Sequence, residues 1–326
     1  MQYSIIRRIR NLASLAAVGL LGLAFVAGCG DRAEARPEAA AGAVAFDHGD
    51  FVGYWNNGTA ELTRYELSQA RYGELHPGHT VLVFVTEEFR KDKQVKLESN
   101  DRAHAVPILK LNRVRKFATG IYDYSMMGSV FTPTEFSKHP RTLKVTTSSQ
   151  EWCGHTFAQF NYRDGGYRLR QFSYFEAEGD ADVKLPGVIL EDALWTRLRL
   201  SPDLLPLGDV ELFPGSFYLR MAHRPLETAR AQARLGAYTG QEFTGKDLKQ
   251  YTLDYADLGR KLEIVFDGEF PYAIAGWRET RMSGFGAGAK PLTTVARRTH
   301  VHRSPYWSEN SLKDRAIRAK LGLPID

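Results

Sequence analysis

The stretch SSQEWCGHTF, residues 148–157, brings together three side chains that could perform chemistry. Cys153 lies two residues before His155 and two residues after Glu151. A protonated histidine beside a thiol lowers the pKa of that thiol and makes it a nucleophile, and a carboxylate can orient the histidine. This constellation would suit a hydrolase or an acyl-transfer enzyme. The same residues could instead hold a metal or act in redox chemistry. A structural thiol is the preferred alternative, because cysteine is among the most buried residue types.

The three side chains can act together only if the backbone places them on one face. If residues 150–163 form one regular strand, their side chains alternate between two faces of a sheet. Glu151, Cys153 and His155 then share the more polar face, while most of the large apolar residues fall on the other. A bulge at Gly154 would shift this register by one residue.

Two further segments carry residues that could form ligand sites. His300 and His302 lie two residues apart on a predicted strand, so their imidazoles could share a metal, although no third ligand is found nearby. The segment SGFGAGAKP (283–291) differs from a phosphate loop because an alanine separates its last glycine from the lysine. We therefore predict a hairpin loop there. We expect no metal site and no cofactor.

A period of two dominates the chain beyond its N-terminal region, which is typical of strands. The clearest segments are residues 80–87, 141–147, 167–176 and 260–267. The first of them is a nearly unbroken apolar run, as expected for a strand covered on both faces. About a dozen short strands exceed what one flat sheet holds. The predicted fold class is therefore mainly β, as a large antiparallel sandwich or a partly closed barrel.

About three short helices accompany these strands. Residues 189–200 and 226–236 show helical spacing or composition, and a third helix is expected over 308–322, where a serine can cap its start and a glycine its end. We expect residues 53–326 to form a single β-rich domain that ends in this C-terminal helix.

A curved sheet with an aromatic lining can enclose an apolar or amphipathic ligand. We therefore predict one apolar cavity, roughly several hundred Å³ in volume. The preferred function is a binding or scaffold module, with the Cys–His enzyme as the alternative. The candidate lining residues are Trp55, Tyr122, Tyr124, Met126, Met127 and Trp277.

The N-terminal region predicts export and lipid attachment. Residues 1–11 contain three arginines and no acid, and residues 12–28 carry no charge. A basic segment followed by an apolar one is typical of a secretory signal. The apolar segment ends in VAGC, which resembles the lipobox of bacterial lipoproteins, where the cysteine becomes the acylated N-terminus. We therefore expect residues 1–28 to be a signal peptide, Cys29 to be the lipidation site and residues 29–52 to be a flexible tether.

A plain membrane-spanning helix is the alternative for this apolar segment. Its 17 residues lie at the short edge of the range that spans a bilayer. Gly30 stands where enteric lipoproteins carry the aspartate that retains them in the inner membrane. By this analogy we expect a protein of the bacterial cell envelope, anchored through acyl chains such as palmitate in the outer membrane and facing the periplasm. The lipid bilayer would then be a partner.

The charge balance argues against nucleic-acid binding. The chain has 43 Lys+Arg against 38 Asp+Glu, a net charge of +5, and removal of the three N-terminal arginines leaves 40 against 38, or +2. A nucleic-acid-binding domain needs a concentrated basic footprint. We therefore expect no nucleic-acid partner, and the ligand would be apolar or an envelope protein.

Several segments together resemble one family of uncharacterised bacterial lipoproteins, some of which carry the label "septum formation inhibitor Maf". The resemblance covers nearly the whole chain after the signal peptide and implies a shared fold and an envelope location, without functional residues to transfer. Genuine Maf proteins are cytoplasmic α/β nucleotide pyrophosphatases with a serine–arginine motif near the start, which this chain lacks. The segments that carry the resemblance include YWNNGTAEL, QARYGEL, TGIYDYSMM, SSQEWCGH, LEDALW, PYAIAGWRET and YWSENS.

Overall fold

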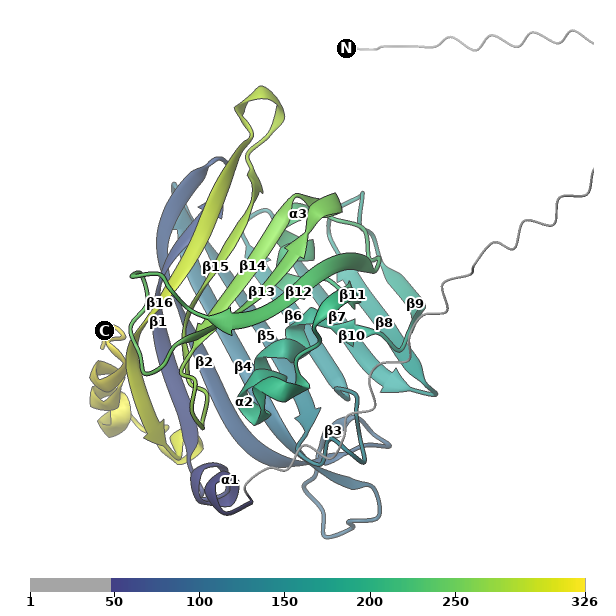
Figure 1. The fold of residues 1–326 in the computed structure, drawn as a ribbon, viewed down its shortest axis with the longest axis vertical. Helices are drawn as coiled ribbons and strands as arrows, with labels where there is room; N and C mark the ends of the chain where they lie inside the picture. Colours follow the sequence, from purple (N-terminus) through teal and green to yellow (C-terminus); the bar gives the residue numbers. More distant parts are fainter. Residues whose placement is uncertain (1–47, 326) are drawn as a thin grey trace, which may run out of the picture. The chain divides into compact units, whose positions relative to one another are not determined.

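The structure, a computed structural model, describes residues 48–325 (Figure 1). The predicted signal peptide and Cys29 lie outside the described residues. Among the described residues, every member of the hydrophobic core clusters lies at position 51 or beyond. A chain of residues 41–326 therefore contains all of these core residues, and the experiments below use this shortened chain.

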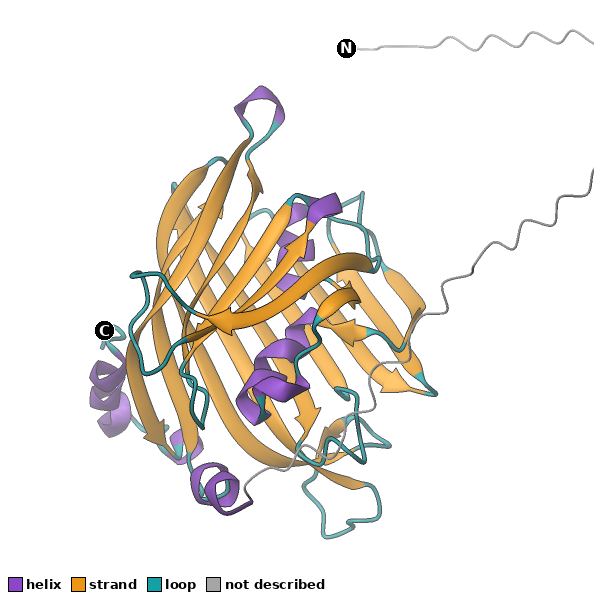
Figure 2. Ribbon diagram, in the orientation of Figure 1, coloured by secondary structure: helices purple, strands orange, loops and turns teal. Residues whose placement is uncertain are grey.

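One sheet contains sixteen strands (Figure 2). They are β1 (Ala60–Arg71), β2 (Glu74–Arg90), β3 (Val95–Lys96), β4 (Ala105–Thr119), β5 (Tyr122–Pro133), β6 (Lys144–Glu151), β7 (Gly154–Arg163), β8 (Gly166–Ser173), β9 (Ala181–Pro186), β10 (Ile189–Leu190), β11 (Gly208–Phe213), β12 (Ala229–Ala237), β13 (Lys249–Tyr255), β14 (Arg260–Phe266), β15 (Ile274–Ser283) and β16 (Lys290–Ser304).

The strands follow one another in space in the order β10–β11–β12–β13–β14–β15–β16–β1–β2–β4–β5–β6–β7–β8–β9, with β3 paired to β2. The short β10–β11 pair is parallel, and the long pairs are antiparallel. The edge strands β9 and β10 do not pair with each other, so the sheet does not close. The predicted mainly β, antiparallel class is confirmed, and a single curled sheet combines features of the two predicted alternatives.

The predicted alternation of side chains is present in the strands. In β14 the three residues Leu262, Ile264 and Phe266 are buried on the concave face, as their spacing predicts. Tight turns join several neighbouring strands, and the β1–β2 turn has positive φ at both Tyr72 and Gly73. Two-residue hairpin turns of this kind match the twist of antiparallel strands.

The helices α2 and α3 lie on the concave side of the sheet (Figure 1). All seven residues of α2 are buried, and its Leu194 and Leu198 are completely inaccessible. Six residues of α3 are buried as well. The helices are α1 (His48–Trp55), α2 (Leu194–Leu200) and α3 (Ser216–Ala222), with shorter or tighter 3₁₀ helices η1 (Glu191–Ala193), η2 (Pro202–Leu204), η3 (Ala256–Leu258), η4 (Gly286–Gly288), η5 (Tyr306–Ser308) and η6 (Leu312–Leu321).

Several of the charged groups that enter this interior form buried ion pairs. A buried charge is tolerated when a partner and hydrogen bonds compensate its lost hydration. The best example joins α2 to β1, where both terminal nitrogens of Arg199 donate to Glu61, at 2.6 and 2.7 Å. The interior pairs are Glu61–Arg199, Glu191–Arg260, Glu279–Arg260 and Asp192–Arg113.

The convex face of β1 and β2 is also covered. Leu62, Val81 and Val83 point outward and form a second apolar cluster with Leu321 at the end of η6. This cover explains the unbroken apolar run of residues 80–87, which the sequence analysis assigned to a strand buried on both faces. The C-terminal helix predicted over 308–322 is thus present, although its helical part is the 3₁₀ helix η6, which starts after a capping box at Ser311.

The predicted helix at 226–236 is wrong, because most of this segment belongs to β12. Its alanine- and arginine-rich sequence has good intrinsic helix propensity, which is a weak effect that tertiary pairing overrides. Here β11 and β13 hydrogen-bond on either side, and Ala231 and Ala233 turn into the core. At the other end of the domain, α1 begins at His48, inside the range expected as a tether, and Phe51 packs into the core.

Across residues 48–325, none of the helices combines the length and the apolar character needed to cross a lipid bilayer.

Candidate functional site

The segment that carries the predicted catalytic residues is a hairpin and not one continuous strand. Strand β6 ends at Glu151 and β7 begins at Gly154, and these two residues face each other across a two-residue turn. Cys153 lies in this turn and is exposed. A Cβ atom at Gly154 would come within 2.9 Å of the Tyr174 ring, so glycine allows this close approach.

The turn separates the three predicted catalytic side chains. His155 pairs with Gln150 on the convex face and is exposed. Glu151 points to the concave side, where its Oε1 accepts a hydrogen bond of 2.7 Å from Arg220. The expectation that Glu151, Cys153 and His155 share one face is therefore wrong, because reversal of the chain at residues 152–153 breaks the alternation on which it rested.

The predicted lining residues occupy three different environments. Trp55, Tyr124, Met126 and Trp277 are buried within the main core cluster. Met127 points outward with 41% of its surface exposed, and Tyr122 is half-buried at one end of the sheet. These side chains therefore do not share one environment, and the buried helices α2 and α3 contribute to the same core cluster.

The end of the sheet near Tyr122 gathers exposed aromatic side chains. Successive antiparallel strands reverse direction, so every second connection lies at the same end. The β1–β2, β4–β5, β6–β7, β8–β9 and β15–β16 connections meet there. Trp152, Tyr174 and Phe285 are 71%, 77% and 74% exposed. We call Tyr72, Tyr122, Trp152, Tyr174 and Phe285 the aromatic rim.

Ring contacts make much of this rim continuous. The Tyr72 and Phe285 ring centroids are 5.8 Å apart, and those of Tyr122 and Trp152 are 6.3 Å apart. The Tyr122 hydroxyl donates to the Tyr72 hydroxyl at 3.0 Å and links these two pairs. The Tyr174 ring lies next to Gly154, two residues after Trp152 in the chain. The rim therefore presents apolar aromatic rings with polar hydroxyl groups between them.

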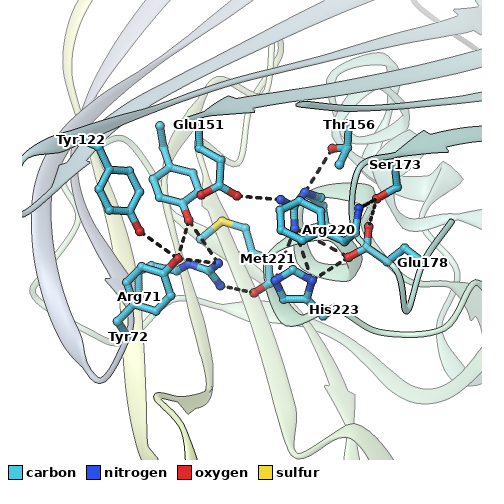
Figure 3. A network of polar contacts seen from close by, with 12 residues as sticks. Arg71, Tyr72, Tyr122, Glu151, Thr156, Ser173, Glu178, Arg220, Met221 and His223 are labelled. Atoms are coloured by element: carbon cyan, nitrogen blue, oxygen red, sulfur yellow. Dashed lines mark hydrogen bonds and ion pairs between the residues drawn. The ribbon is translucent and has the colours of Figure 1, made fainter. Parts of the chain in front are cut away.

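Arg71 holds the inner side of the rim (Figure 3). Its Nη2 donates to the hydroxyls of Tyr72 and Tyr124, each at 3.2 Å, and these hydroxyls lie 2.7 Å apart. Burial raises the pKa of Tyr124, as do the nearby Glu151 and Tyr72. Burial also raises the pKa of Tyr122. The hydroxyls of Tyr122 and Tyr124 therefore stay protonated at neutral pH and offer hydrogen bonds, not general bases.

A second cluster surrounds Arg220 of α3 (Figure 3). In addition to Glu151, the guanidinium contacts Thr156 Oγ1 at 3.1 Å and Glu178 at 3.7 Å. His223 Nδ1 lies 2.6 Å from the same Glu178 carboxylate. Burial alone would raise the pKa of Glu178, but the bonds from His223 and Ser173 and the charge of Arg220 hold it below its usual value. The carboxylate is thus ionised and fully engaged.

The two clusters together fix the C-terminal end of α3. Arg71 Nη1 donates to the Met221 carbonyl at this end, and Arg220 joins the helix to β6 and β7. The guanidinium also lies 4.2 Å from the centre of the Phe175 ring. Each charged group of the network makes at least one of these bonds, and together the bonds stabilise α3 beneath the rim. It offers no nucleophile with a free base.

The histidines considered as metal ligands do not assemble a site. His300 and His302 lie on β16, and His300 packs against Gly322 at the end of η6. No group of three or more histidine, cysteine, aspartate or glutamate side chains in residues 48–325 is arranged to hold a metal ion. The glycine-rich segment 283–291 forms the β15–β16 connection, as predicted.

Sequence analysis missed Arg71, Glu178, Arg220 and His223. Arg220 gave one usable signal, a single arginine within the apolar segment SFYLRMA, because an arginine is rarely buried without a partner. The rim gave another, since Trp152 and Phe285 each stand next to turn residues. Neither local pattern predicts which residues from distant parts of the chain form contacts with each other.

Comparison of the chain with models of known protein families, with curated proteins and with solved structures found no match.

Proposed function

We propose that this protein is a lipid-anchored binding module of the bacterial cell envelope that takes an amphipathic ligand on its aromatic rim. The observation that carries the proposal is the gathering of exposed rings from separate connections at one end of the sheet. Scattered apolar residues are normal on a protein surface, whereas a concentration of them marks a binding surface. Tyrosine and tryptophan combine an apolar body with a polar tip, as an amphipathic ligand requires.

The rim also indicates the chemistry of the ligand. An apolar portion would lie against the faces of Trp152, Tyr174 and Phe285, and a polar head would meet the hydroxyls of Tyr72 and Tyr122. Glu74 and Asp123 are exposed next to the rim. Their charges disfavour an anionic head through like-charge repulsion. We therefore favour a neutral or zwitterionic head group.

The anchor is a separate part of the proposal. Cys29 would carry the acyl chains, and several chains hold a protein stably on a membrane where one does so only marginally. Helix α1, where the described chain begins, contacts β2 through a hydrogen bond from Thr86 to the Trp55 carbonyl, at the end of the sheet opposite the rim. The rim would thus be free for a ligand. Cys29→Ala should abolish labelling by a radioactive fatty acid, and equal labelling of the variant would contradict the anchor.

Calorimetric titration tests the rim. The probe is dihexanoylphosphatidylcholine below its critical micelle concentration, added to residues 41–326. The double variant Trp152→Ala/Phe285→Ala should lose binding by roughly tenfold or more, since each aromatic anchor contributes on the order of 1–2 kcal/mol. The matched control is Leu312→Ala/Trp307→Ala, which removes exposed apolar side chains from the C-terminal segment. Equal affinities of the two variants for the probe would refute the proposal.

A further inference from the structure

A basic groove lies on the convex face of the sheet over β6, β7 and β8, at the end opposite the rim. Its volume is about 450 Å³. This lies within the range of small-molecule sites, roughly 300–1,000 Å³. None of its lining residues is acidic. They are Lys93, Gln94, Val95, Lys144, Gln159, Asn161, Arg163, Arg168 and Arg170.

The wall of this groove is held in place by hydrogen bonds. Gln94 lies in the connection from β2 to β3 with a positive φ of 60° and is 3% exposed. Its side-chain oxygen accepts from Asn161 at 3.1 Å, and its backbone oxygen accepts from Lys144 Nζ at 3.0 Å. Gln159 in turn donates to Asn161 at 2.7 Å. The connection is therefore joined to β6 and β7, and the groove exists before any ligand binds.

The charges of the groove are only partly neutralised. Arg168 forms a two-point contact with Asp182, at 2.7 and 2.6 Å, and Arg170 shares the same carboxylate at 3.5 Å. No carboxylate within residues 48–325 forms an ion pair with Lys93, Lys144 or Arg163.

Two of these three cations, Arg163 and Lys144, donate hydrogen bonds to backbone oxygens. Arg163 Nη2 donates to the Asp92 carbonyl at 3.0 Å, and Lys144 donates to Gln94 as described above. Burial lowers the pKa of Lys144. Such a group gains from an approaching anion, because the anion compensates the cost of its desolvated positive charge.

We propose that this groove binds a multiply charged oxyanion of the phosphate type. The two parallel N–H groups of a guanidinium match the geometry of phosphate oxygens, and a lysine ammonium adds positive charge with few directional constraints. The groove lies at the same end of the sheet as α1, where the described chain begins, so the oxyanion could belong to a lipid head group or to a free phosphate compound. The groove and the aromatic rim are at opposite ends of the sheet, and this proposal does not depend on the rim.

Two binding arms distinguish the sources. In the first, tripolyphosphate is titrated calorimetrically into residues 41–326 at about 0.15 M ionic strength, where long-range attraction is largely screened. In the second, sedimentation measures binding to vesicles of phosphatidylglycerol and of phosphatidylcholine. Tripolyphosphate binding alone identifies a free phosphate compound, and selective binding to phosphatidylglycerol identifies a head group. Either result supports the proposal.

Variants then assign the binding to the groove. Lys93→Gln/Arg163→Gln should weaken binding by roughly tenfold or more, as expected from loss of a charge-assisted hydrogen bond. Lys116→Gln/Arg234→Gln removes the same charge from exposed positions on other strands and should change affinity less than twofold. Lys93→Gln alone removes the charge of a side chain that forms no hydrogen bond with another residue in 48–325, and this variant serves if the double variant does not fold. Absence of binding in both arms, or equal losses in the groove and control variants, would overturn the proposal.

Discussion

The contact between Arg220 and Glu151 offers the sharpest test of how α3 is held. Both side chains are nearly inaccessible, at 7% and 2% exposure. Arg220→Met keeps most of the aliphatic stem and removes the charge. In this variant the Glu151 carboxylate remains buried without its ion-pair partner.

The structure sets the size of this effect. Removing one partner of a buried ion pair costs about 3–5 kcal/mol. The variant also loses the hydrogen bond to Thr156 and the contact with the Phe175 ring, and each such contact contributes about 1 kcal/mol. Added together, these contributions predict a fall of about 5–7 kcal/mol in the free energy of unfolding, a large share of the roughly 5–15 kcal/mol of a typical protein.

Urea unfolding of residues 41–326, followed by tryptophan fluorescence, measures this loss. The matched control is Arg102→Met, which breaks the exposed ion pair with Glu88 and should cost less than about 1 kcal/mol. A double-mutant cycle with Glu151→Gln should show a coupling of about 1–3 kcal/mol.

The reasoning would be refuted by either of two results. One is an Arg220→Met variant as stable as Arg102→Met. The other is a cycle in which the two single costs simply add, since the pair would then contribute nothing as a pair.

Three further predictions follow from the same structure. In residues 41–326, where Cys153 is the single cysteine, the folded protein should react with one equivalent of a thiol-specific reagent at a rate unchanged by His155→Gln; a slower variant would revive the Cys–His enzyme. Trp277→Ala should cost about 3–5 kcal/mol of unfolding free energy, and Trp152→Ala less than about 0.5 kcal/mol, which urea unfolding would measure. Burial would raise the pKa of Glu279, but buried arginines lower it to about 2. Because this folded-state pKa is depressed, its stabilisation is complete above the unfolded pKa and is lost as pH falls towards about 2. The stability difference between wild type and Glu279→Gln should therefore shrink from pH 5 to pH 2, and a constant difference would count against this pairing.

Much of the fold follows from local patterns. Alternation in residues 260–267 predicts β14, and the apolar run at 80–87 predicts a strand covered on both faces, because each pattern reflects which side chains meet the core. The error at 226–236 has the opposite cause. Its alanines and arginines suit a helix in isolation, and only the neighbouring strands β11 and β13, which are not visible locally, make it a strand.

The candidate site was less accessible to sequence reasoning. Its groups meet through pairing of strands that are far apart along the chain, as where Arg71 of β1 reaches Met221 of α3. The turn at Trp152 and Cys153 was missed because the segment lacks the usual asparagine–glycine or aspartate–glycine signal. Because the chain reverses at this turn, Glu151 lies on the concave face, whereas one regular strand predicts the convex face. The predicted catalytic group and the predicted cavity both depended on such long-range placements.

The most direct test of the rim as the binding surface uses the five tryptophans of the chain as reporters. Residues 41–326 labelled with 5-fluorotryptophan would be titrated with dihexanoylphosphatidylcholine and followed by ¹⁹F NMR. Trp152 lies on the rim, Trp307 is 49% exposed in the C-terminal segment, and Trp55, Trp195 and Trp277 are buried. We predict a saturable shift of the Trp152 resonance alone. Shifts of the buried tryptophans, or equal shifts of Trp152 and Trp307, would contradict binding at the rim.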